Sequence, residues 1–175
     1  GKDNDLMVGG TAASGTVYNN MYGQHGMDEM YGGSATGGAL GGSGATTHNT
    51  MEGGNGNDTM TGGSALGVIL GGFGGEVYNT MYGDSGDDTM QGGYGLPGAL
   101  GGFTGTVVNE MHGGDGADTM TGGNQNDLMY GDAGNDYMEG GDGDDTMHGG
   151  DGDDEMHGQG GNDTLYGDAG NDHLY

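Results

Sequence analysis

Apolar residues occupy one fixed place in short glycine-rich units along this chain. In GGDGDDTMH, residues 140–148, a glycine turn leads to Asp145, and Met147 then stands between two polar neighbours. One apolar residue between two polar ones predicts a short β-strand that directs Met147 to one face of a sheet and its neighbours to the other. Each unit therefore predicts one turn and one strand of about three residues.

The units are regular in the C-terminal part. From Gly113 the chain divides into seven units of nine residues with no remainder. In every unit the sixth residue is Asp and the eighth is Met or Leu. Tandem units of fixed length indicate a repeat architecture in which stacked units bury a continuous core.

The N-terminal part keeps the same phase although its units differ in length. Nine-residue units alternate there with 21-residue units that begin at Gly32, Gly62 and Gly92, so the period is 30. Of the 14 methionines, 13 fall on the inward eighth position, and Met27 is the exception. We therefore expect one continuous solenoid, in which residues 1–112 carry long insertions on one edge and residues 113–175 form a regular nonapeptide roll.

If each coil consists of two half-turns, the polar residues that end the turns form two columns on opposite edges. The first edge then carries Asp5, Asp28, Asp58, Asp88, Asp118, Asp136, Asp154 and Asp172. The second edge carries Asn19, Asn49, Asn79 and Asn109, followed by Asp127, Asp145 and Asp163.

The composition indicates that such a fold must be stabilised by something outside the chain. The sequence has 50 glycines, 27 acidic residues against one lysine, a net charge of -26 and 30% hydrophobic residues. Ordering the backbone costs about 1–2 kcal/mol per residue, and a chain of this composition is typically disordered. Cysteine is absent, which excludes disulfides and leaves metal binding or assembly. One lysine cannot form a nucleic-acid-binding patch, and no apolar run approaches a membrane span.

The turns offer the oxygen ligands that calcium prefers. It takes six to eight oxygen ligands, from carboxylates and backbone carbonyls, and one turn supplies too few of them. Two turns stacked about 4.8 Å apart can share an ion, and ions on the two edges would number about seven to nine. The aspartates of both edges are the candidate carboxylate ligands. The candidate carbonyl ligands are Gly26, Gly56, Gly86, Gly116, Gly134, Gly152, Gly170 and Gly143.

Segments such as GGNGNDTMT, residues 53–61, and GGDGADTMT, residues 113–121, resemble the RTX nonapeptide G-G-x-G-x-D-x-U-x. The resemblance implies an all-β fold, a right-handed parallel β-roll that binds calcium, in a bacterial protein exported by type I secretion. Such repeats occur in toxins, proteases, lipases, epimerases, adhesins and surface layers. This chain departs from the family in placing Met where Leu or Ile is common, and in its 30-residue period.

Two features leave alternatives open. Leu40, Leu70 and Leu100 align in the insertions and form either the core of a lateral lobe or an exposed ridge that binds a neighbouring copy. A separate column, on the outward face of one sheet, contains His112, Tyr130, His148 and Tyr166. This column is either a surface ladder or a transition-metal site.

We expect no enzymatic activity, because the sequence has no Cys and no G-x-S-x-G motif. The expected function is that of a calcium-binding structural protein outside the cell, in a fibre, surface layer or adhesin. The alternative is a module that aids export and folding of a secreted enzyme or toxin. Met7 and Leu174 keep the inward pattern in the first and last units. We therefore expect further protein beyond the ends, or copies stacked end to end with calcium between Asp172 and Asp5.

Overall fold

The structure is a computed structural model that describes residues 3–36, 44–66, 74–96 and 105–175. All regular elements within these residues are β-strands, and all strand pairing is parallel. No helix in the described part of the chain could span a membrane. The predicted fold class, an all-β parallel β-roll, is confirmed.

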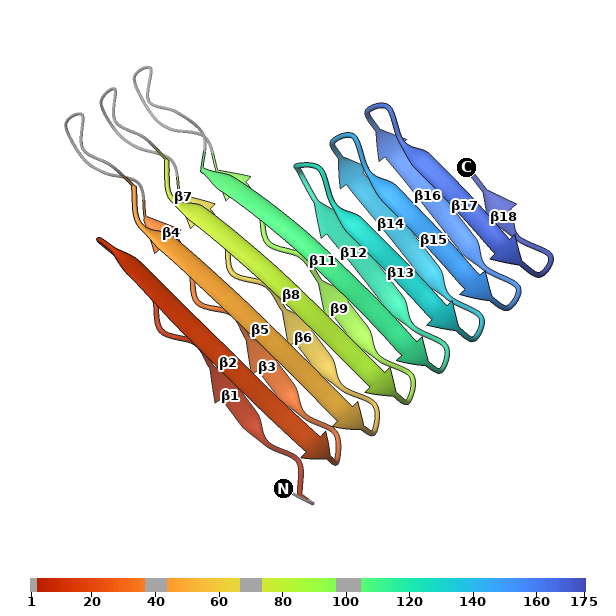
Figure 1. Cartoon of the computed structure of the whole chain (residues 1–175), viewed down its shortest axis with the longest axis horizontal. Helices are drawn as coiled ribbons and strands as arrows, with labels where there is room; N and C mark the ends of the chain where they lie inside the picture. Colours follow the sequence, from red (N-terminus) through yellow and green to blue (C-terminus); the bar gives the residue numbers. More distant parts are fainter. Residues whose placement is uncertain (1–2, 37–43, 67–73, 97–104) are drawn as a thin grey trace.

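Two large sheets form the two walls of the roll, and the chain passes from one to the other in every coil (Figure 1). Successive coils follow one another along the roll, so the termini lie at opposite ends. The eight-stranded sheet contains β1 (Leu6–Val8), β3 (Glu29–Tyr31), β6 (Thr59–Thr61), β9 (Thr89–Gln91), β12 (Thr119–Gly123), β14 (Tyr137–Asp142), β16 (Glu155–Gly160) and β18 (His173–Leu174). The seven-stranded sheet contains β2 (Thr16–His25), β5 (Thr46–Asn55), β8 (Glu76–Ser85), β11 (Thr106–Asp115), β13 (Leu128–Ala133), β15 (Thr146–Asp151) and β17 (Thr164–Ala169).

Methionine fills the space between the two walls. The register pairs Met51 with Met81 and Met120 with Met138, so each methionine stacks on that of the next coil. Twelve methionines are buried in this core, with Met7 and Leu165 packed against it. Met27, the one methionine outside the repeat phase, is 60% exposed. The phase deduced from the sequence therefore assigns the core correctly.

Several strands are longer than the three residues that the alternation predicts. β15 has six residues, because pairing continues from Met147 through the glycines that open the next unit. β5 has ten residues, because its pairing also begins five residues before Met51. The position that a Cβ on Gly131 would take lies 2.3 Å from the carbonyl oxygen of Gly149 in the next coil. Adjacent backbones approach so closely here that only glycine fits, and the ladder runs on where the sequence predicts a turn.

The described residues of the long units include a small lateral lobe next to the second edge. A small three-stranded sheet, β4 (Ala35–Thr36), β7 (Ala65–Leu66) and β10 (Gly95–Leu96), lies there. A separate core contains Ala12, Ala35, Ala45, Ala65, Val77 and Val107. The described part of the lobe therefore has a small core of alanine and valine side chains. Leu40, Leu70 and Leu100 lie outside the described residues.

Core packing can be tested with two methionines of opposite burial. Met90→Ala removes a side chain that is 1% exposed, and truncation of a buried methionine costs about 2–5 kcal/mol. Met27→Ala is the matched control and should change the free energy of unfolding by less than about 0.5 kcal/mol. Urea unfolding in saturating calcium, followed by circular dichroism, measures both. Equal destabilisation by the two variants would show that the methionine phase is misassigned.

Candidate calcium-binding edges

The aspartates of the first edge form a continuous hydrogen-bonded ladder from coil to coil. The backbone N–H of Asp58 donates to Oδ1 of Asp88 at 2.7 Å, and that of Asp88 donates to Oδ1 of Asp118 at 2.7 Å. The same bond links every consecutive pair from Asp5 to Asp172. The structure thus brings together the predicted residues of this edge: Asp5, Asp28, Asp58, Asp88, Asp118, Asp136, Asp154 and Asp172.

The second oxygen of most of these carboxylates is buried without a hydrogen-bond partner. The carboxylates concerned, on both edges, are those of Asp28, Asp58, Asp88, Asp118, Asp127, Asp136, Asp145 and Asp154. A buried, unpaired carboxylate oxygen is costly, because it has lost its hydration without compensation.

The oxygen environment around each carboxylate increases this cost. The position that a Cβ on Gly83 would take lies 2.3 Å from Oδ2 of Asp88 and 2.3 Å from the carbonyl oxygen of Gly113. Two oxygens from successive coils therefore approach one small space beside a glycine. An oxygen-rich space of this kind favours a cation or a proton.

The raised pKa values of the aspartates also indicate that these buried carboxylates favour a nearby cation or a proton. Burial is the largest cause that raises the pKa of Asp88, Asp127 and Asp136 to about 7. It also raises the pKa of Asp118 to about 6. Neighbouring aspartates raise the pKa of Asp88 further, whereas the hydrogen bond from the Asp58 backbone lowers it. The pKa values of Asp58, Asp145 and Asp154 are raised as well, again chiefly by burial.

The glycines whose carbonyl oxygens are predicted to bind calcium lie at the same turns. Gly116 has φ 145°, and a Cβ there would lie 1.8 Å from the carbonyl oxygen of Gly86. The Gly86 carbonyl therefore points along the roll toward the next coil. Positive φ values also occur at the other predicted donors, Gly26, Gly56, Gly134, Gly143, Gly152 and Gly170. Gly161 has the same conformation, with φ 142°. Sequence reasoning missed it, although it occupies the fourth place of its unit.

The second edge changes character along the chain. In its C-terminal part, Asp127, Asp145 and Asp163 repeat the aspartate ladder, with N–H···Oδ1 distances of 2.8 and 3.0 Å. In its N-terminal part, asparagine amides pair directly, and Nδ2 of Asn49 donates to Oδ1 of Asn79 at 2.7 Å. The ladder contains Asn19, Asn49, Asn79 and Asn109, and its last amide donates to Oδ1 of Asp127.

The asparagine ladder needs no ion. Nδ2 of Asn79 donates to the Gly63 carbonyl at 3.1 Å as well as to the next amide. Its Oδ1 accepts from the backbone N–H of Gly63 at 2.9 Å and from Asn49. Asn49, Asn79 and Asn109 lie inside the ten-residue strands rather than at turns, between the methionine core and the lobe. Donors and acceptors are thus matched within the protein, in contrast to the unpaired aspartates.

The donor set of the aspartate turns fits calcium. The buried partnerless groups are carboxylate oxygens, and hard oxygen donors are the ligands that calcium prefers. In the described residues, no three acidic or histidine side chains gather into a cage. An ion at these turns would therefore be held by one aspartate of a turn together with backbone carbonyls, and its charge would neutralise the buried carboxylates.

The difference between the edges predicts different outcomes for two substitutions. Asp58→Asn keeps the shape but removes the charge, so the number of bound calcium ions should fall by one or two. Asn79→Ala should keep the ion count and lower the free energy of unfolding by about 1–3 kcal/mol, because it leaves buried partners unsatisfied. Native mass spectrometry counts the ions, and urea unfolding in calcium measures stability. If Asn79→Ala lost bound ions and Asp58→Asn lost none, calcium would be bound at the asparagine edge rather than at the aspartate edge.

The raised pKa values predict a pH dependence in the absence of calcium. Their folded-state pKa values of about 6–7 exceed the ordinary aspartate pKa of 3.8, so the calcium-free fold retains protons that the unfolded chain releases. The stability contributed by these groups is complete below about pH 4 and is lost as the pH rises through about 6–7. With chelator present, β-sheet circular dichroism should therefore decrease from about pH 5 to about pH 8. An increase over this range would contradict the prediction.

Comparison with known proteins agrees with the geometry. The family model described as the RTX calcium-binding nonapeptide repeat matches residues 41–75, 73–95, 105–138, 112–147 and 139–174, which together cover more than half of the chain. No curated protein matches the sequence. The stacked aspartate turns, the methionine core and this match lead to one conclusion: the chain belongs to the RTX family of calcium-binding nonapeptide repeat proteins.

Proposed function

We propose that this chain is an extracellular structural repeat protein whose fold forms when calcium binds along its aspartate edges. The observation that carries the proposal is the set of eight buried carboxylate oxygens without a partner. They cannot remain charged in a stable fold unless cations neutralise them. The energy of metal binding then becomes energy of folding.

The number of ions follows from the gaps between aspartates. The first edge has eight aspartates, and the second has three in succession, which allow about seven to nine shared sites. The proposed ligands are the aspartates of both edges and the turn carbonyls described above. The asparagine ladder is proposed to remain free of metal. At the low calcium concentration inside a cell, the chain would bind few ions and stay unfolded. At the higher calcium concentration outside the cell, it would bind calcium and fold.

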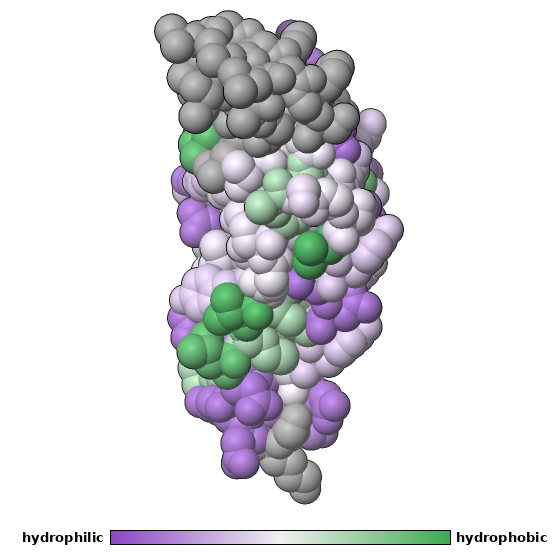
Figure 2. Space-filling view, turned by 90° about the vertical axis from the view of Figure 1, so that its left-hand side faces the viewer, coloured by the Kyte–Doolittle hydropathy of each residue, from purple (hydrophilic) through white to green (hydrophobic). Residues whose placement is uncertain are grey.

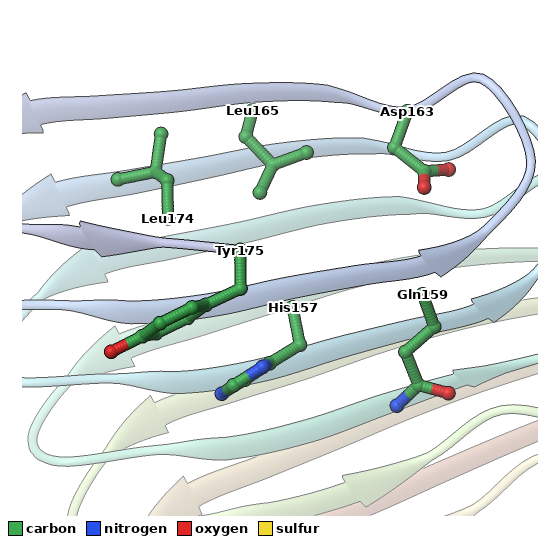
Figure 3. A pocket seen from close by; sticks show the side chains of 6 residues that line it. All are labelled: His157, Gln159, Asp163, Leu165, Leu174 and Tyr175. Carbon is green, nitrogen blue, oxygen red and sulfur yellow. The ribbon is translucent and has the colours of Figure 1, made fainter.

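Self-association would make the roll a component of a fibre, surface layer or adhesin. β1 and β2 at one end, and β17 and β18 at the other, each have only one neighbour among the described strands. Figure 2 shows apolar side chains at the surface of the N-terminal end, where Leu6 is 66% and Val8 71% exposed. At the other end, Leu165 and Leu174 line a hollow with Tyr175 (Figure 3). Unpaired edges beside apolar surface favour further pairing.

The register would accept a further coil at either end, and the proposed occupant is a second copy. Continuing the strand pairing by one coil would place Met7 of the next copy beside Leu174 and Tyr22 beside Tyr166. It would also bring Asp5 next to Asp172, which extends the aspartate ladder across the junction. The alternative function is a module of a secreted enzyme or toxin that aids export and folding, in which the next coil or domain belongs to the same protein.

Calcium removal tests the proposed function. At neutral pH, excess chelator should convert the far-UV circular dichroism spectrum from β-sheet to disordered coil, and added calcium should restore it. Light scattering in the same titration should rise after folding if copies stack. A chain that stays folded in chelator at neutral pH would refute calcium-coupled folding. A folded monomer at millimolar calcium and high protein concentration would favour the module over the fibre component.

A further inference from the structure

The outer face of the seven-stranded sheet carries a row of stacked rings. Tyr82, His112, Tyr130, His148 and Tyr166 follow one another in successive coils, with ring centroids 4.5–5.2 Å apart and interplanar angles of 13–18°. Each histidine is therefore held between two tyrosines. Stacking covers the ring faces and fixes the orientation of the imidazole edges, where the nitrogen atoms lie.

The residues two positions after these rings alternate in step with them. Asp84, Asp132 and Asp168 follow the tyrosines, whereas Gly114 and Gly150 follow the histidines. Each histidine thus has a glycine beside it and an aspartate in the coil on either side. One hollow is lined by residues that include Asp84, His112, Gly114 and Asp132, and a second repeats this set with Asp132, His148, Gly150 and Asp168.

The aspartates of this row adopt an uncommon backbone conformation. Asp84, Asp132 and Asp168 have φ values of 72°, 71° and 63°, in the left-handed region that glycine adopts without strain. Gly114 and Gly150 occupy the corresponding place with φ 104° and 107°. Glycine would therefore suit all coils, yet alternate coils carry a carboxylate beside the hollow.

Each histidine presents a ring nitrogen to a carboxylate oxygen of a neighbouring coil. Nδ1 of His148 lies 3.2 Å from Oδ2 of Asp168, and Nδ1 of His112 lies 3.9 Å from Oδ2 of Asp132. Nε2 of His112 lies 3.4 Å from Oε1 of Glu110. Histidines that bind metal through one nitrogen commonly have a carboxylate at the other, which orients the ring. His112 has this arrangement.

We propose that the two hollows bind late first-row transition-metal ions, with Zn²⁺ as the probe, through His112 with Asp132 and through His148 with Asp168. Zinc bonds of about 2.0–2.2 Å to nitrogen and oxygen in tetrahedral geometry place the two ligand atoms about 3.3 Å apart, close to the separation at His148. Imidazole suits zinc, copper and nickel, whereas calcium prefers oxygen. Each hollow supplies two protein ligands and leaves the remaining positions to water, so these sites differ in kind from the aspartate turns.

The test uses the full chain saturated with calcium. Zinc titration by isothermal calorimetry should show two sites, and the imidazole NMR resonances of His112 and His148 should respond. His148→Asn and Asp168→Asn should each remove one site and leave the other. His48→Asn is the matched control, since His48 is also stacked between two tyrosines, Tyr18 and Tyr78, but Thr50 stands two positions after it. This control should keep both sites.

Three results would overturn the proposal. The first is the absence of zinc binding at up to millimolar zinc. The second is binding that the His148 and Asp168 variants leave unchanged, which would assign the zinc to other carboxylates. The third is equal loss in the His48 variant, which would show an effect of ring stacking alone. Far-UV circular dichroism in calcium verifies that every variant is folded, so loss of a zinc site cannot be confused with loss of the roll.

Discussion

The fold depends on how the buried aspartate carboxylates of the two edges are neutralised. In eight of these aspartates, Oδ1 accepts the ladder hydrogen bond and Oδ2 is buried without a hydrogen-bond partner. Removing a carboxylate from water costs several kcal/mol, about the whole stability of a small domain. A cation shared between coils, as proposed above, would turn this cost into an attraction along the roll. It would allow the short strands and glycine turns to be ordered although the apolar core is one methionine deep on each wall.

The asparagine ladder shows a second solution to the same problem in the same molecule. Its amides carry both donors and acceptors, so a column of them pairs with itself and with the Gly33, Gly63 and Gly93 backbone. A carboxylate column cannot do this, because a charged carboxylate only accepts. The ladder lies where the long strands pass from the methionine core to the lobe. At this repeat position, Asn therefore gives amides that pair from coil to coil, whereas Asp leaves a buried carboxylate oxygen without a partner.

Much of this organisation could be predicted from the sequence. The methionine phase identified the core, and the period placed each aspartate and asparagine in its column, because every coil repeats the same geometry. The pattern could not give the strand lengths, since pairing through glycines leaves no trace in hydrophobic alternation. It also missed the full satisfaction of the Asn79 amide and the pairing of His148 with Asp168, which depend on side-chain positions across coils.

The most direct measurement of the central claim is a crystal structure of the calcium-loaded chain with anomalous scattering from bound lanthanide or calcium. We expect anomalous peaks between successive turns along the edge from Asp5 to Asp172 and beside Asp127, Asp145 and Asp163. We expect none along the column from Asn19 to Asn109. Peaks along the asparagine column, or a fully ordered roll with no peaks beside the buried aspartates, would contradict it.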